Sequence, residues 1–245
     1  MLPWLKQFIL PSLLSIGITY LTLRLLFRRS LQGSAAPVET IEPLSPQGRA
    51  AAWSILLAGA LLIFISARGL DLGLPTCAAA LVAVPFVTRT DGRAIMEIIR
   101  GVSWRVLPLV AALFIVVEAL QQAGALERIG FVFSKIDALP RPLVPLTGSF
   151  LAAAVSNLMN NLPCALLTGG ALHATQVSKP LHSALLIGID LGPNLSITGS
   201  LASLLWLIAL RREGISVSAW TFLKNGAIVM TPALLLAALA LASGA

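Results

Sequence analysis

The stretch Ile187–Ile208, IGIDLGPNLSITGSLASLLWLI, decides how this chain is interpreted, because it is apolar enough for a membrane yet contains a carboxylate and helix breakers. A charged side chain at the bilayer centre costs about 2.5–3.5 kcal/mol on insertion scales. Gly192 and Pro193 break the helix beside Asp190 and free backbone groups that lipid cannot satisfy. Such a segment persists only inside protein or beside a water-filled cavity, so it predicts a substrate or ion site of a transporter.

The composition also indicates a membrane protein. Of the 245 residues, 57% are hydrophobic and only 11% are charged, with a mean hydropathy of +0.91, whereas soluble domains carry about 25% charged residues. The net charge is +7, but Lys and Arg lie in the connections between apolar runs, as membrane topology requires. No basic patch with interleaved aromatic residues is present, so we expect the lipid bilayer, and not a nucleic acid, as the main partner.

The sequence contains no recognisable catalytic or cofactor motif. Cys77 and Cys164 lie in apolar runs and have the character of free, buried thiols. His173 and His182 have no neighbouring carboxylate, so a metal site is not expected. Because hydrolase, metalloprotease and ATPase patterns are missing as well, we expect no enzyme activity, no cofactor, no metal and no catalytic residue in this chain.

Seven apolar segments follow one another along the chain, at Phe8–Phe27, Ala51–Ala67, Leu72–Val87, Val106–Leu120, Pro142–Ala174, Leu181–Leu210 and Ala227–Leu241. The first is too long for the apolar core of a signal peptide and is expected to be a membrane span. We predict a single all-α membrane domain over 1–245 with about six transmembrane helices. It also contains a polar connector (28–50), a re-entrant helical hairpin (142–176) and a broken helix (181–210).

The distribution of positive charge favours the re-entrant hairpin. If Pro142–Ala174 enters and leaves on one side, ten Lys and Arg lie in the loops 28–50, 88–105 and 211–224, against six on the other side. If Pro142–Ala174 crossed the membrane once instead, each side would carry eight Lys and Arg. The excess of positive charge in cytoplasmic loops therefore places both termini outside and the three basic loops inside.

Two groups of polar residues could form the site. Asp190 could take and give a proton in a dry interior, or it could cap the half-helix that follows. The amides at the turn of the hairpin and the polar residues after the second break could bind a hydroxylated solute, or could cap helices. The solute-binding candidates are Asn157, Asn160, Asn161, Asn194, Ser196 and Thr198, and the helix-breaking candidates are Pro163, Gly192, Pro193 and Gly199. Glu118, near a segment end, is expected to face water at the interface.

Two motifs resemble a known family. Ser156–Pro163, SNLMNNLP, and Asp190–Leu207, DLGPNLSITGSLASLLWL, resemble the arsenite/antimonite efflux permeases, which read S-x-x-M-N-N-x-P and then D-L-G-P-K-x-T-P-I-G-S-L-A-T-L-L-W. The resemblance implies a bacterial inner-membrane protein of the ion transporter superfamily, built from two inverted repeats that each contain a hairpin and a broken helix. It implies an antiporter that expels metalloid hydroxides in exchange for protons, alone or with an ATPase subunit.

The chain departs from that family in four respects. Asn194 stands where the family has Lys, Ile197 where it has Pro, and Cys164 where it has Thr. The chain also resembles only the C-terminal half of the family's members. It is therefore expected to need an N-terminal half-transporter chain or a second copy of itself. Alternative hypotheses are another solute or anion carrier of the superfamily, and a non-transporting membrane subunit or truncated remnant.

Overall fold

The computed structural model describes residues 2–32, 43–89 and 91–243, and within them it contains α-helices, two short 3-10 helices and no strand. The predicted all-α membrane class is confirmed. The helices are α1 (Leu2–Leu26), α2 (Arg28–Leu31), α3 (Pro46–Ala67), α4 (Gly73–Thr88), α5 (Gly92–Gly101), α6 (Val106–Gln122), α7 (Ala125–Asp137), α8 (Leu143–Met159), α9 (Asn161–Ala174), α10 (Lys179–Leu191), η1 (Gly192–Leu195), η2 (Ile197–Gly199), α11 (Leu201–Arg212) and α12 (Ala219–Ala242).

Three helices are long and apolar enough to cross a bilayer, namely Trp4–Leu26, Pro46–Ala67 and Ala219–Ala242. A fourth crossing results if α5 and α6 together form one broken span. The other predicted spans are α4, with 16 residues, and the pair α10 and α11, with 13 and 12 residues. About 20 residues are needed to cross the hydrocarbon core. The predicted six transmembrane helices are therefore reached only if short or interrupted helices also cross.

The described residues form two compact units. Unit 1 contains α3, α4 and α5, and unit 2 contains α1, α2 and α6–α12. No residue of α3 is buried, and most of its large apolar side chains are exposed, as suits a helix whose surface meets lipid. The predicted single membrane domain over 1–245 therefore consists of two compact units in this structure. That both units belong to one domain in the membrane stays a prediction.

Several predicted boundaries were wrong, and helix caps explain most of the shifts. The connector 28–50 was expected to extend to residue 50, but α3 begins at Pro46 because the Ser45 hydroxyl accepts from the Gly48 N–H at 3.0 Å. The middle of that connector lies outside the described residues. Likewise α12 begins before Ala227, since Ser218 caps it through the Thr221 N–H at 3.0 Å. The expected loop 88–105 contains α5.

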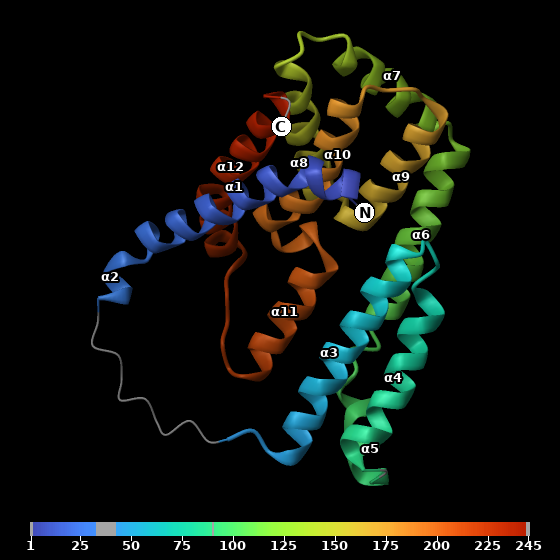
Figure 1. The fold of residues 1–245 in the computed structure, drawn as a ribbon, viewed down its shortest axis with the longest axis vertical. Coiled ribbons are helices and arrows are strands. Elements are labelled where there is room, and N and C mark those ends of the chain that lie inside the picture. Colours follow the sequence, from blue (N-terminus) through green and yellow to red (C-terminus); the bar gives the residue numbers. More distant parts are fainter. Residues whose placement is uncertain (1, 33–42, 90, 244–245) are drawn as a thin grey trace. The chain divides into compact units, whose positions relative to one another are not determined.

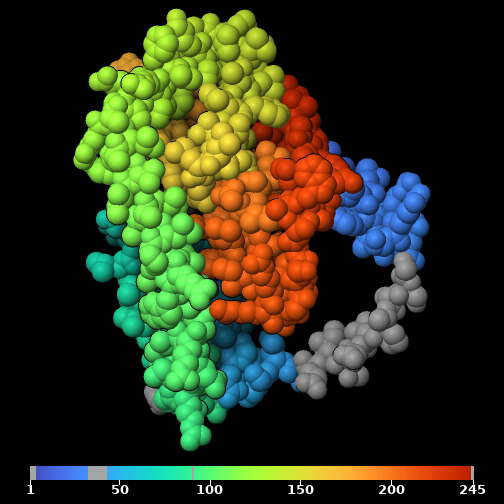
Figure 2. Space-filling view, turned by 180° about the vertical axis from the view of Figure 1, so that it is seen from behind, coloured from blue at the N-terminus to red at the C-terminus, as the bar shows by residue number. Residues whose placement is uncertain are grey.

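The centre of unit 2 is α8, which packs against α9, α10 and α12 (Figure 1). One apolar cluster joins α7, α8, α9 and α10 around Leu181 and Leu185. A second joins α1, α8, α10 and α12 around Ala153, Ala184 and Leu234. In Figure 2 the side chains of α6, α7 and α9, in green to yellow, form a continuous face of this unit.

The two ends of the α8–α9 pair are held together. Asp137, at the end of α7, accepts hydrogen bonds from Ser178, which caps α10; the Ser178 N–H lies 2.8 Å from Oδ2, and the Ser178 hydroxyl donates to Oδ1. The chain therefore leaves α7, passes through α8 and α9, and returns to the same end of the unit, as Figure 1 shows. This is the geometry expected of a re-entrant hairpin, whose placement in a membrane stays a prediction.

Small residues let α10 approach α8 closely. A methyl group added at Gly188 would collide with the Ser149 carbonyl oxygen and would lie 2.8 Å from the Ala152 Cβ. We predict that Gly188→Ala lowers the thermal stability of the purified chain, because overpacking of this kind costs about 1–3 kcal/mol. The measurement is thermal unfolding in detergent.

Gly169→Ala is the matched control. Gly169 lies within α9, and nothing lies within 4 Å of the methyl group that the change would add. That variant should be at least as stable as the parent. Its free energy of unfolding could rise by up to about 1 kcal/mol, because Ala has a higher helix propensity than Gly. Equal stability of the two variants would contradict the close approach of α8 and α10.

Candidate functional site: two interrupted helices and a cavity

The first interruption is the turn between α8 and α9. Asn160 has a positive φ of 77°, which is uncommon for a residue with a side chain and is best tolerated by Asn and Asp. Its side-chain oxygen accepts from the Leu162 N–H at 3.2 Å and so caps α9, with Pro163 in the first turn. The capping interpretation of this amide is therefore confirmed.

The second interruption separates α10 from α11. The chain passes through η1 and η2, and α11 begins only at Leu201, where the Ser200 hydroxyl accepts from the Ala202 N–H at 3.1 Å. The predicted break at Gly192 and Pro193 is thus present, and it extends to Ser200. The alternative that Asp190 caps the following half-helix is wrong, because Asp190 lies in the last turn of α10.

Asn157 joins the two interruptions. Its amide nitrogen donates to the Gly192 carbonyl at 2.6 Å and to the Ala153 carbonyl at 2.7 Å, and its oxygen accepts from the Ser196 hydroxyl at 2.7 Å. Both N–H groups of the amide are therefore used by backbone carbonyls, one in α8 and one at the start of the break. Asn157 thus bonds to the backbone at the point where α10 ends and η1 begins.

Further polar contacts complete this junction. The Asn160 amide donates to the Thr198 carbonyl at 3.0 Å, and the Thr198 hydroxyl donates to the Asn157 carbonyl at 3.4 Å. Ser196 and Thr198 hydroxyls lie 3.3 Å apart. A methyl group at Gly199 would lie 2.8 Å from the Asn157 oxygen, so only glycine leaves space there. We call the side chains of Asn157, Asn160, Ser196 and Thr198 the polar junction.

Asp190 does not belong to the polar junction, and the structure corrects its expected surroundings. The sequence predicts a carboxylate enclosed in a dry interior, whereas the Asp190 side chain is exposed on the outer side of α10. No hydrogen bond or ion pair involves this carboxylate within the described part of the chain. The reason is geometric: Gly188 in α10 and Gly192 directly after it both face α8, so Asp190, midway between them, points away from α8.

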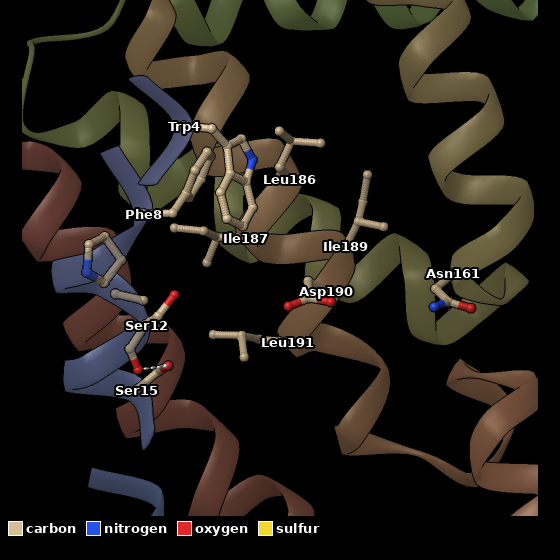
Figure 3. A pocket seen from close by; sticks show the side chains of 12 residues that line it. Trp4, Phe8, Ser12, Ser15, Asn161, Leu186, Ile187, Ile189, Asp190 and Leu191 are labelled. Carbon is tan, nitrogen blue, oxygen red and sulfur yellow. Dashed lines mark hydrogen bonds between the residues drawn. The ribbon is translucent and has the colours of Figure 1, made fainter. Parts of the chain in front are cut away.

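The Asp190 carboxylate faces a cavity of about 500 Å³. Figure 3 shows it between the serines of α1 on one side and Asn161 of α9 on the other. Trp4 and Phe8, whose ring centres are 5.1 Å apart, form part of its apolar wall. No side-chain hydrogen bond of Asn161 is found in the described residues, so this amide can meet a solute. Asn194 lies elsewhere, exposed, and donates to the Leu191 carbonyl at 3.2 Å.

The role of α1 was missed by the sequence reasoning. Ser12 and Ser15 line the cavity, and the Ser15 hydroxyl donates to the Ser12 carbonyl at 2.9 Å. Gln7 of the same helix donates to the Ser183 hydroxyl in α10. The signal was present in the sequence: Phe8, Ser12 and Ser15 recur at helical spacing and mark one face of an otherwise apolar helix. Their contact with α10, however, could not be predicted without the structure.

The fold and these two interruptions define an α-helical, multi-pass membrane protein with a broken helix packed against a helical hairpin. A family model described as "arsenical pump membrane protein" matches residues 2–243. The chain therefore belongs to the arsenical pump membrane protein family, as the two motifs predict.

Individual relatives agree with this assignment. The arsenical pump membrane protein of Escherichia coli K12 and that of Yersinia enterocolitica are each 30% identical to the chain, over 93% of it and 56% of the relative. An uncharacterised transporter of Mycobacterium tuberculosis is 26% identical over 65% of the chain and 39% of its own length. The chain thus spans about half the length of the arsenical pump relatives. No solved structure matches it.

The polar junction predicts how a single amide controls the broken helix. Asn157→Ala removes three side-chain hydrogen bonds, among them the one to the Gly192 carbonyl, and each such bond contributes about 0.5–1.5 kcal/mol. We predict faster amide hydrogen exchange over residues 192–200, measured by mass spectrometry on the purified chain.

Asn194→Ala is the control, since Asn194 is exposed and its amide bonds only to a carbonyl of its own turn. Exchange over 192–200 should stay close to that of the parent. If Asn157→Ala leaves the exchange of this segment unchanged, the amide does not hold the break.

Proposed function

We propose that this chain is one half of a secondary transporter that exports arsenite and antimonite across the bacterial inner membrane in exchange for protons. The observation that carries the proposal is the cavity in which the Asp190 carboxylate and the Asn161 amide lie beside two interrupted helices. Membership of the arsenical pump membrane protein family supports the solute, because relatives named as arsenical pumps match 93% of the chain.

The chemistry of the cavity suits a neutral trihydroxide. Each hydroxyl of such a solute both donates and accepts a hydrogen bond, and an amide offers both functions without charge. Asn161 would therefore hold the solute, and the serine hydroxyls of α1 would extend the polar wall. The polar junction would act indirectly: its amides and hydroxyls are used by one another and by backbone carbonyls, so they fix the shape of the two breaks.

Asp190 would carry the coupling proton. It is the one Asp or Glu among the residues that line this cavity. An ionisable group at membrane depth is kept where it serves a pathway for ions or protons. Binding a proton removes the carboxylate charge and allows α10 to face a less polar environment, whereas releasing the proton restores the charge.

The exposure of Asp190 supports the need for a second half. Transporters of this kind enclose their solute between two structural repeats near the bilayer midplane. In this chain the hairpin and broken helix cover one side of the cavity only, and the side of α10 that carries Asp190 is open. A separately encoded N-terminal half, a second copy of the chain, or assembly with an ATPase subunit could complete it, and we favour the N-terminal half.

The test is accumulation of radioactive arsenite in bacteria that lack their own arsenic exporters. We predict that the chain, co-expressed with a candidate N-terminal half, lowers the accumulation of arsenite. Asp190→Asn should return the accumulation to the level without the chain, because a coupling carboxylate has no substitute; the efflux rate then falls on the order of tenfold. Membrane levels of each variant are measured in parallel.

Glu118→Gln is the matched control. Glu118 is exposed, accepts from the Gln122 amide at 2.9 Å and lies outside the cavity, so its loss of charge should leave efflux unchanged. Equal accumulation with and without the chain, in the presence of the partner, would remove the arsenite proposal. Efflux that survives in Asp190→Asn would remove the coupling role while leaving the transport proposal standing.

A further inference from the structure

Helix α5 is a feature of unit 1 that the proposed transport does not use. Its sequence, GRAIMEIIRG, separates into two faces at 100° per residue: Arg93, Glu97 and Arg100 share one face, and the apolar residues occupy the other. The preceding helix α4 is different, because it contains no charged residue. An apolar helix is suited to the bilayer interior, whereas a strongly two-faced one is suited to its surface.

The apolar face of α5 is only partly covered. Ala94 and Ile95 are half-buried where α5 packs near α4. Met96 and Ile99 are 47% and 44% exposed, and Trp104 is 54% exposed. The indole N–H of Trp104 donates to the Ile99 carbonyl at 2.8 Å and so fixes the ring beside this face.

The connection between α4 and α5 places α5 at the end of an apolar helix of 16 residues that the sequence predicts to cross the membrane. Only residues 89–91 separate them, and Arg89 ends α4 in the left-handed region with a φ of 51°. Asp91 then caps α5, its carboxylate accepting from the Arg93 N–H at 2.9 Å. A helix that starts three residues after an apolar span, with charges along one face, begins at the level of the lipid headgroups.

The charges on the polar face are available to headgroups. Arg93 and Arg100 are exposed, and neither is in an ion pair with an acidic residue of the described chain. They lie next to Met96 and Ile99 on the helix surface, an arrangement in which the arginine stems follow the apolar face and the guanidinium groups reach the headgroups. Guanidinium groups bind phosphate through two parallel hydrogen bonds.

We propose that α5 lies in the plane of the membrane surface and binds the headgroups of anionic phospholipids. Met96, Ile99 and Trp104 would lie at the boundary of the acyl chains, and Arg93 and Arg100 would contact lipid phosphates. The distribution of Lys and Arg predicts the cytoplasmic leaflet for this loop, which is the leaflet with the negative surface potential. In the alternative, in which α5 and α6 form one broken span, the part of α5 that enters the lipid would bring Arg100 with it, followed by Glu97.

The test uses the full chain in phosphatidylcholine nanodiscs that contain a small fraction of phosphatidylglycerol. Native mass spectrometry, after gentle release from the nanodisc, counts the phosphatidylglycerol molecules that stay bound. We predict that Arg93→Gln together with Arg100→Gln weakens retention by about thirtyfold, which corresponds to about 1 kcal/mol for each basic residue. Both side chains are exposed, so thermal unfolding should be unchanged.

Arg28→Gln together with Arg29→Gln is the matched control, because it removes the same charge from exposed arginines of α2 on the same predicted side of the membrane. Retention in this control should equal that of the parent. An equal loss in both double variants, or no loss in the α5 variant, would overturn the proposal. Displacement of the lipid by excess glycerol phosphate would also overturn it, since that result indicates a site for a soluble anion.

Discussion

The fold of unit 2 depends on how it satisfies the backbone groups that its two interrupted helices expose. Inside a bilayer no water is available to them, and each unsatisfied group costs several kcal/mol. Asn157 meets this constraint by donating from α8 to the Gly192 carbonyl at 2.6 Å, and Asn160 donates to the Thr198 carbonyl at 3.0 Å. The amides of the hairpin thus bond to backbone carbonyls within the second break.

This arrangement links the hairpin to the broken helix mechanically. Side chains from the end of α8 bond to backbone on both sides of Ser196, so a shift of either element disturbs the other. At the opposite end, Asp137 and Ser178 hold the entry and exit of the hairpin together. Between these two fixed points, α10 packs on α8 through small residues and presents Asp190 on its other side. The cavity is therefore bordered by an element whose position is set by the polar junction.

The sequence was informative where chemistry is local. A run of eight residues with three Asn and a Pro predicts a helix turn with caps, and a Gly-Pro pair inside an apolar segment predicts a break; both are found. What could not be predicted was which polar residues satisfy one another. Asn157 and Ser196 are 39 positions apart, and only the packing of α8 against α10 and η1 brings them to 2.7 Å. The outward direction of Asp190 likewise could not be predicted, because it follows from the close packing of Gly188 and Gly192 against α8.

The hairpin turn and the broken helix form one unit because polar side chains of the polar junction join them. A double-mutant cycle on Asn157 and Ser196, with Asn157→Ala, Ser196→Ala and the combined variant compared by thermal unfolding, measures their interaction directly. We predict a coupling free energy of about 0.5–3 kcal/mol, the range found for residues in contact. Strictly additive effects of the two substitutions would show that these two side chains do not hold the hairpin turn and the broken helix together.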